Sequence, residues 1–281
     1  MQRNIEKTIQ RTYQAWLTHR EYSPATIQKY TKALARFFSD TGAGKIPDRE
    51  TVAAWRDDLA GQGYSPATVN GLLAAVNMYQ ESIDNPAGKA KPLKCQRRIF
   101  ADPGRELSRT EYFRLLNAAR QTGSKRTLLL LQTICSTGIR VSELKYITAE
   151  AVRRHKASIR CKGKCREILL PAELCHRLTR WCQQRRIHTG PVFLSRQGKP
   201  LSRVTVWKLF KSLCGRANVA WKKVFPHNLR HLFVRTFYDI EKNISKLADL
   251  IGHSSIETTR IYIMESGAEH ERLLNKMHLL L

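Results

Sequence analysis

Two histidines, an arginine and a tyrosine follow one another at short intervals between residues 226 and 262: His227, Arg230, His253 and Tyr262. An arginine presents a fork of hydrogen-bond donors to phosphate oxygens, and a histidine donates hydrogen bonds or moves protons. A tyrosine hydroxyl can act as a covalent nucleophile. Together these residue types predict the attack of a side-chain hydroxyl on a phosphodiester.

A helix is expected to hold the first two of these side chains together. Pro226 favours a helix start, so His227 and Arg230, which are three residues apart, fall on one face of that helix. A single phosphate can then contact both. His231 follows directly and is expected to point elsewhere, as a core or helix-surface histidine.

A glycine fixes the expected position of the second histidine. Gly252 has the place of a C-cap after a helix over residues 244–251, which holds His253 in a turn between two helices. Tyr262 is expected about two turns into the second of these helices. The turn and the helix would bring His253 and Tyr262 to the same phosphate.

Two cationic positions upstream extend the set. Arg140 follows Gly138 at the junction of two helices, where a guanidinium and backbone N–H groups can bind an anion together. An ion pair between Arg140 and Glu143 is the structural alternative. Lys162 lies at a predicted hairpin turn, from which it can reach DNA and protonate a leaving oxygen. Lys164, on the same turn, is the alternative to Lys162.

The whole set resembles the tyrosine recombinase (phage integrase) family, whose pattern is Arg…Lys…His-x-x-Arg…His/Trp…Tyr. The resemblance rests on Thr137-Gly138-Ile139-Arg140, Lys162-Gly163, His227-Asn228-Leu229-Arg230, Leu250-Ile251-Gly252-His253 and Tyr262. The spacing from the hairpin to Pro171 departs slightly from the family pattern, which keeps Lys164 open beside Lys162. The chain is most similar to the compact, Xer-like members.

This resemblance implies a mechanism. Tyr262 would attack phosphorus, giving a 3′-phosphotyrosyl link and a free 5′ hydroxyl. Lys162 would protonate the leaving oxygen, and His227 would assist proton transfer or positioning. The charge on the phosphorane would be stabilised by Arg140, Arg230 and His253. Because the covalent link conserves the bond energy, the resemblance implies neither a cofactor nor a metal.

Charge indicates the partner. The chain has 49 Lys and Arg against 23 Asp and Glu, a net charge of +26. Residues 1–95 hold 13 basic and 9 acidic residues (13 − 9 = +4), and residues 96–281 hold 36 and 14 (36 − 14 = +22). Such a one-sided excess favours a polyanion, and double-stranded DNA is the expected partner.

Two similar segments organise the N-terminal part, since residues 22–26 and 64–68 both read Tyr-Ser-Pro-Ala-Thr. Each is typical of a helix start, with Ser at the N-cap and Pro at the first helical position. Periodic apolar residues follow both segments. Residues 1–90 are therefore predicted to form a helical bundle, which resembles the SAM-like core-binding domain of the family.

The remaining chain is predicted to form a linker and a second domain. Residues 91–107 read as a basic linker, and residues 108–281 as the tyrosine recombinase catalytic domain, which opens with a capping box at Ser108. Residues 158–161 and 167–170 are expected to pair as two strands. The predicted fold class is mainly α, a helical bundle plus a mixed, mainly-α domain with a small antiparallel β-sheet.

The composition also predicts the cellular compartment of the protein. The seven cysteines are odd in number and irregularly spaced, without paired Cys-x2-Cys units, so neither disulfides nor a metal site is expected. No apolar run is long enough to span a membrane, and the N-terminus lacks the apolar core of a signal peptide. A cytoplasmic protein, associated with the nucleoid when bound to DNA, is expected.

The C-terminal tail suggests how copies assemble. Apolar residues recur at helical spacing there, at Leu273, Leu274, Met277, Leu280 and Leu281. In many relatives the segment after the tyrosine docks on a neighbouring subunit. The resemblance therefore implies a homotetramer on two DNA duplexes, with the C-terminal helix docking in trans.

The leading interpretation is a site-specific recombinase of a mobile element, which acts in integration, excision, inversion or dimer resolution. It has two competitors. A type IB topoisomerase uses similar chemistry without pairing sites. A non-catalytic helix-turn-helix transcription regulator would explain residues 247–252, the helix expected after them and the charge. It would leave four residues as coincidences: Arg140, His227, Arg230 and Tyr262.

Overall fold

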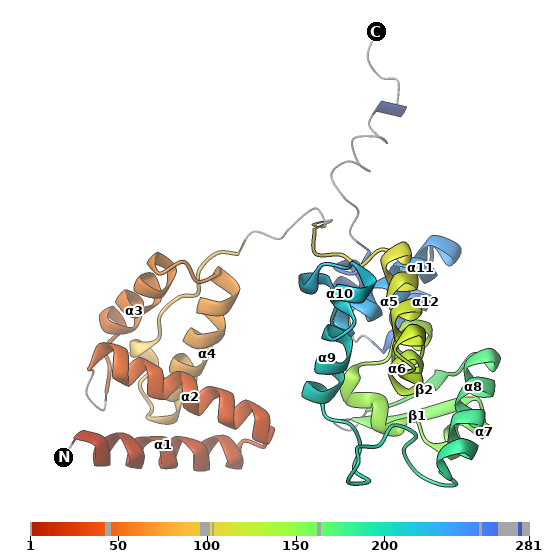
Figure 1. Ribbon diagram of the computed structural model, residues 1–281. Coiled ribbons are helices and arrows are strands. Elements are labelled where there is room, and N and C mark those ends of the chain that lie inside the picture. Colours follow the sequence, from red (N-terminus) through yellow and green to blue (C-terminus); the bar gives the residue numbers. More distant parts are fainter. Residues whose placement is uncertain are drawn as a thin grey trace. The chain divides into compact units, whose positions relative to one another are not determined.

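The computed structural model describes residues 2–42, 46–95, 102, 104–161, 164–252, 255–263 and 275–276. The chain divides into two compact units, residues 1–97 and 98–281 (Figure 1). Each unit has its own hydrophobic core. Among the described residues, no helix is both long and apolar enough to cross a membrane.

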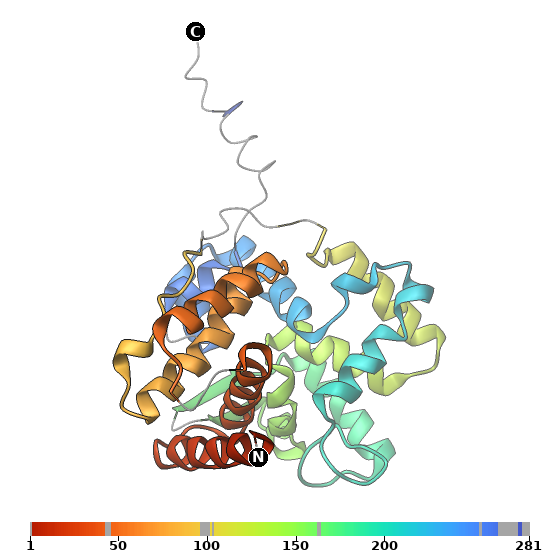
Figure 2. The same cartoon turned by 90° about the vertical axis from the view of Figure 1, so that its left-hand side faces the viewer.

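The first unit is a bundle of helices. Its elements are α1 (Gln2–His19), α2 (Pro24–Thr41), α3 (Arg49–Gly61), α4 (Pro66–Ser82) and the 3-10 turn η1 (Pro86–Gly88). Helix α2 packs against both α1 and α4, and α3 packs against α4 (Figures 1 and 2). The helical bundle expected for this part of the sequence is confirmed.

The two repeated segments start α2 and α4 in the same way. The side chains of Ser23 and Ser65 accept hydrogen bonds from the backbone N–H groups of Thr26 and Thr68. A proline occupies the first turn of each helix. Local chemistry alone therefore sets both helix starts.

Buried polar groups connect the bundle with the chain that leaves it. Gln80 is fully buried and donates to the carbonyl oxygens of Pro47 (2.7 Å) and Gly88 (3.3 Å). Asn70 accepts from the N–H of Leu93 (2.8 Å) and donates to its carbonyl (2.9 Å). The chain after η1 is thus held along the bundle as far as Leu93.

The second unit is mainly helical with one two-stranded sheet. Its elements are α5 (Arg109–Gln121), α6 (Lys125–Thr137), η2 (Val141–Tyr146), α7 (Ala149–Arg153), β1 (Lys156–Cys161), β2 (Lys164–Leu169), α8 (Ala172–Arg185), α9 (Arg203–Lys211), α10 (Cys214–Ala217), η3 (Trp221–Lys223), α11 (Pro226–Glu241), α12 (Ile244–Ile251) and α13 (Ile256–Arg260). The predicted fold class is confirmed.

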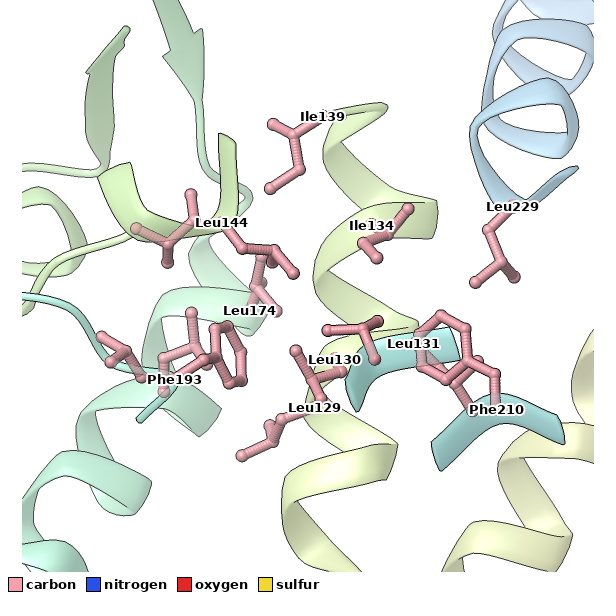
Figure 3. Close-up of a cluster of buried hydrophobic side chains, with 14 of the residues drawn as sticks. Leu129, Leu130, Leu131, Ile134, Ile139, Leu144, Leu174, Phe193, Phe210 and Leu229 are labelled. Atoms are coloured by element: carbon pink, nitrogen blue, oxygen red, sulfur yellow. The ribbon is translucent and has the colours of Figure 1, made fainter. Parts of the chain in front are cut away.

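Helix α6 runs through the centre of this unit. Its leucines pack in a cluster with Leu144, Leu174 and Phe193 on one side and with Phe210 and Leu229 on the other (Figure 3). The apolar run that the sequence shows in α6 is therefore a buried core helix. Its C-terminal end leads directly into the candidate site.

The hairpin pairs in antiparallel register from Lys156 opposite Leu169 to Cys161 opposite Lys164. Both strands begin earlier than the sequence suggested, because residues 156 and 164 already take part in the ladder. Ser108 and Glu111 form the expected capping box at the start of α5. Local signals thus located the hairpin and this helix start within a few residues.

Candidate functional site

A glycine at the end of α6 shapes the site. Gly138 has φ +63°, and its N–H donates to the carbonyl of Ile134. A Cβ atom at Gly138 would lie 2.4 Å from Cδ1 and 2.6 Å from Cε1 of Phe233. Both the left-handed backbone and this close approach require glycine. The chain can therefore turn sharply from α6 into η2, whose N-cap residue is Arg140.

Arg140 is held by Glu143. The Glu143 carboxylate accepts from the backbone N–H of Arg140 (2.7 Å) and from its guanidinium (3.1 Å). The carboxylate is buried, whereas the Arg140 side chain is 42% exposed. The ion pair first considered as a structural alternative is present. It leaves the guanidinium accessible to an anion, so the structural and functional interpretations of Arg140 are compatible.

Arg230, on α11, is the largest fully buried side chain of the described residues. Its guanidinium donates to the carbonyl oxygens of Gly138 and of Ile251 (3.0 Å). Burial, followed by the charge of Arg140, lowers the pKa of Arg230 to about 10, so it stays protonated at neutral pH. Arg230 thus joins α11 to the ends of α6 and α12.

Tyr262 lies against α11 with its hydroxyl 3.2 Å from Nε2 of His227. The tyrosine is 8% exposed and packs with Val234, Leu247 and Ile251. It follows the end of α13, which has only five residues, so the expected position two turns into a helix is wrong. Packing on α11 and α12, not a long helix, positions this hydroxyl.

The charge state of His227 follows from its surroundings. Burial, then the positive charges of His231, Arg230 and Arg140, lowers the pKa of His227 to about 4. The lowered pKa makes the ring neutral at pH 7, and a neutral ring 3.2 Å from the Tyr262 hydroxyl can exchange a proton with it.

The expectation that His231 points elsewhere is wrong. Its ring lies 4.3 Å from the Tyr262 ring and 4.9 Å from the His227 ring, measured between centroids. The reason is helical geometry: His231 is one residue from Arg230 but four from His227, and residues four apart share a helix face. This spacing was visible in the sequence.

Glu106 also lies at the site, beside His231, and the sequence did not predict this position. Its carboxylate lies 3.6 Å from Nδ1 of His231 and 3.2 Å from the guanidinium of Arg235. Burial acts to raise the pKa of Glu106, but the hydrogen bond from His231 and the charge of Arg235 lower it below the usual value. No local motif marks Glu106, because its partners are more than 120 residues away.

Three of the candidate residues are not described with their side chains. Lys162 and His253 lie outside the described residues, and for Lys164 only the backbone, paired in β2, is described. Gly252 takes the predicted C-cap position of α12, with φ +65°. The structure therefore brings together four of the candidate residues: Arg140, His227, Arg230 and Tyr262. Beside His253, it describes the preceding residue, Gly252.

In the described part of the chain, no cluster of three or more His, Cys, Asp or Glu residues is arranged to hold a metal ion. The described cysteines are free thiols: Cys95, Cys135, Cys165, Cys175, Cys182 and Cys214.

Several known proteins resemble this chain over most of its length. Tyrosine recombinase XerA of Thermococcus onnurineus is 29% identical over 259 residues, which cover 89% of this chain and 88% of that protein. Tyrosine recombinase XerD of Halalkalibacterium halodurans is 26% identical over 282 residues, covering 92% and 93%.

Solved structures share the fold. A lambda integrase dimer bound to a COC′ core site matches with a TM-score of 0.73 and 17% identity, covering 93% of this chain and 96% of that one. XerH recombinase bound to a palindromic difH substrate matches with a TM-score of 0.71 and 20% identity, covering 98% and 84%. Residues 105–269, more than half of the chain and including all the candidate site residues, match the phage integrase family. The chain belongs to this family.

Proposed function

We propose that this protein is a site-specific DNA recombinase that cuts and rejoins DNA through a 3′-phosphotyrosyl intermediate. The observation that carries the proposal is the 3.2 Å approach of the Tyr262 hydroxyl to His227. The charge of Arg140 acts on the pKa of both His227 and Arg230, so the two arginines and the neutral histidine lie near one another. A nucleophile, a neutral proton-exchanging group and fixed positive charge are what phosphoryl transfer requires.

In the proposed reaction, the Tyr262 oxygen forms a bond to phosphorus as the bond to the 5′ oxygen breaks. His227 takes the tyrosine proton, and Arg140 stabilises charge on the non-bridging oxygens. We propose that Lys162, or alternatively Lys164, gives a proton to the leaving oxygen. We propose that His253 donates a further hydrogen bond to the phosphate. The 5′ hydroxyl of a second strand then reverses the step and the strands are exchanged.

The buried position of Arg230 gives it a second role. Its guanidinium bonds the backbone at Gly138 and Ile251, so it orders the turns that precede Arg140 and His253. We propose that it contacts phosphate only once DNA is bound, when a non-bridging oxygen competes for its donors. Until then it fixes the geometry of the site.

The competing interpretation as a helix-turn-helix regulator has less support. A recognition helix presents exposed side chains to the major groove. Here the helix after the turn, α13, has five residues, and Tyr262 beyond it is buried against α11. A topoisomerase of type IB remains distinguishable only by its products, because its first chemical step is the same.

The proposed partners follow from charge and family. We propose that double-stranded DNA binds both units, with residues 1–90 as the core-binding domain, residues 91–107 as a linker and residues 108–281 as the catalytic domain. A lambda integrase tetramer bound to a Holliday junction is among the similar structures. We propose a tetramer on two duplexes here too, with the tail after residue 263 docking in trans, and action at the nucleoid in the cytoplasm.

Covalent capture tests the nucleophile. The target is first selected by the protein from a pool of random duplexes, and a nick is then placed beside each scissile candidate so that cleavage cannot reverse. The wild type should give a protein–DNA adduct on a denaturing gel, and Tyr262→Phe should give none. Tyr238→Phe, which removes a hydroxyl from a tyrosine packed against the same hydrophobic cluster, should keep the adduct.

The outcomes separate the proposed classes. An adduct that persists in Tyr262→Phe overturns the assignment of the nucleophile. Salt-sensitive binding to the selected site with no adduct in the wild type supports the regulator instead. Adduct formation followed by exchange between two duplexes supports the recombinase, whereas relaxation of supercoiled plasmid without exchange supports the topoisomerase.

A further inference from the structure

Arg166 is a candidate for a role that no sequence motif assigned. It lies on β2, four residues after Lys162, and pairs with Ile159 of β1. Its side chain is 17% exposed and turns towards η2 instead of solvent. There its Nη2 atom donates to Oε2 of Glu143 at 2.6 Å, a short charge-assisted hydrogen bond.

The same carboxylate holds Arg140. Oε2 of Glu143 accepts from the backbone N–H of Arg140 at 2.7 Å, and Oε1 accepts from its guanidinium at 3.1 Å. Glu143 therefore lies between two arginines, one at the turn after α6 and one on the hairpin. A change in the position of Arg166 moves the carboxylate that orients Arg140.

The other side of Arg166 contacts the turn after α12. A Cβ atom at Gly252 would lie 2.4 Å from Cδ, 2.7 Å from Nη1 and 3.0 Å from Nε of Arg166. The arginine side chain therefore lies directly on the backbone of Gly252. The next residue in the chain is His253, so Arg166 supports the turn that carries this histidine.

Arg166 also acts on the buried arginine. Its charge is among the causes that lower the pKa of Arg230, after burial and the charge of Arg140. Arg230 bonds the carbonyl of Ile251, the residue before Gly252. One hairpin side chain is thus in contact with Glu143 and Gly252 and electrostatically coupled to Arg230.

We propose that Arg166 is a positioning residue that couples the seating of the β1–β2 hairpin to the placement of Arg140 and of the turn before His253. When the hairpin carries its lysine to DNA, Arg166 sets the Glu143 carboxylate and packs on Gly252, so the acid and the phosphate-binding groups are assembled together. This inference rests on the proposed function of Tyr262 and Arg140.

The alternative is that Arg166 only neutralises a buried carboxylate. The ion pair between Lys223 and Glu111, at 3.0 Å, is a matched control. Its side chains are 18% and 14% exposed, against 17% and 9% for Arg166 and Glu143. Lys223→Met removes a comparably buried ion pair from the same unit without touching the site. Arg166→Met and Arg166→Lys complete the set.

The experiment measures the single-turnover rate of adduct formation on the selected nicked duplex at saturating protein, together with the Kd for that duplex and the melting temperature. Arg166→Met should slow adduct formation about 10- to 100-fold with an unchanged Kd, as expected for misplaced groups in the transition state. Arg166→Lys keeps a charge for Glu143 and should recover part of the rate. Lys223→Met should lower the melting temperature without slowing the chemistry.

A second arm tests the coupling itself. In a Glu143→Gln background, Arg166→Met should cost little further rate, because the two residues act through one contact. Equal rates in wild type and Arg166→Met, or additive losses in the double variant, would overturn the inference. If Arg166→Met fails to fold, a folded Arg166→Lys with the wild-type rate and no coupling to Glu143→Gln overturns it equally. Absence of any adduct in the wild type refutes the proposed function instead, so the two failures are distinguishable.

Discussion

Replacing Gly138 by alanine perturbs the centre of the site with a single methyl group. Gly138 has φ +63°, and its carbonyl accepts a hydrogen bond from Arg230. The new Cβ would lie 2.4 Å from a ring carbon of Phe233, far inside van der Waals contact. The substitution therefore combines a backbone penalty with an overpacking penalty at the point where α6 meets α11.

The two costs can be estimated separately. Alanine in the left-handed region costs about 1–2 kcal/mol relative to a relaxed backbone. Overpacking a well-packed site costs about 1–3 kcal/mol. Gly138→Ala should therefore lower the free energy of unfolding of unit 98–281 by about 2–5 kcal/mol, the sum of both costs. It should also slow adduct formation, because Arg140 and Arg230 both depend on this turn.

Gly123 provides the matched control. It has φ +65° in the same unit, and a Cβ there would meet no atom within 4 Å. In urea denaturation, Gly123→Ala should show only the backbone cost, about 1–2 kcal/mol. Phe233→Leu should then recover part of the additional loss in Gly138→Ala. Equal losses in the two glycine variants would refute the close approach of Gly138 to Phe233, and with it the packing argument.

Three further predictions concern charge and buried polar groups. The pKa of His227 in the folded chain is about 4, below the ordinary value of 6.5, so the unfolded chain binds the proton first as the pH falls. The free energy of unfolding should therefore fall as the pH drops from 6.5 to 4, and it should fall less in His227→Gln. Urea titrations at several pH values measure this difference. Gln80→Leu leaves the carbonyls of Pro47 and Gly88 without this donor and should destabilise unit 1–97 by about 1–3 kcal/mol, whereas the exposed Gln62→Leu should not. The logarithm of the DNA association constant should fall linearly with the logarithm of the salt concentration, with a slope of roughly −0.9 per phosphate neutralised. A slope near zero would contradict binding through basic side chains.

Local chemistry made part of this architecture predictable. Ser23 and Ser65 cap their helices through atoms three residues away, and Gly138 and Gly252 end theirs by adopting positive φ. These signals lie within one turn of the chain, so the sequence contains them in full. The helix starts, the hairpin and the helix-terminal positions of Arg140 and His227 could be predicted for that reason.

Contacts between distant segments could not be predicted in the same way. Glu106 meets His231 and Arg166 meets Glu143 only after several elements have packed, and neither pair has a characteristic spacing. The length of α13 escaped prediction as well, because packing on α11 and α12, not helical periodicity, holds Tyr262. The position of His231, in contrast, could have been predicted. It lies four residues after His227, and residues four apart share a helix face. Its place directly after Arg230 suggested a different face.

Arg230 is buried at a point where two helices end, and this position affects the charge of the site. Its guanidinium lies at the C-terminal ends of two helices, α6 and α12, where it bonds the carbonyls of Gly138 and Ile251. Each helix end carries roughly half a negative charge, so the two together offset about one positive charge. Glu143 offsets one of the two arginines that it binds, Arg140 and Arg166. About one positive charge then remains for the phosphate, which would gain negative charge in the proposed attack by Tyr262. A lysine in place of Arg230 would offer the two helix ends a single nitrogen instead of two nitrogens in a fixed fork, and this would weaken the common anchor of the turns before Arg140 and His253.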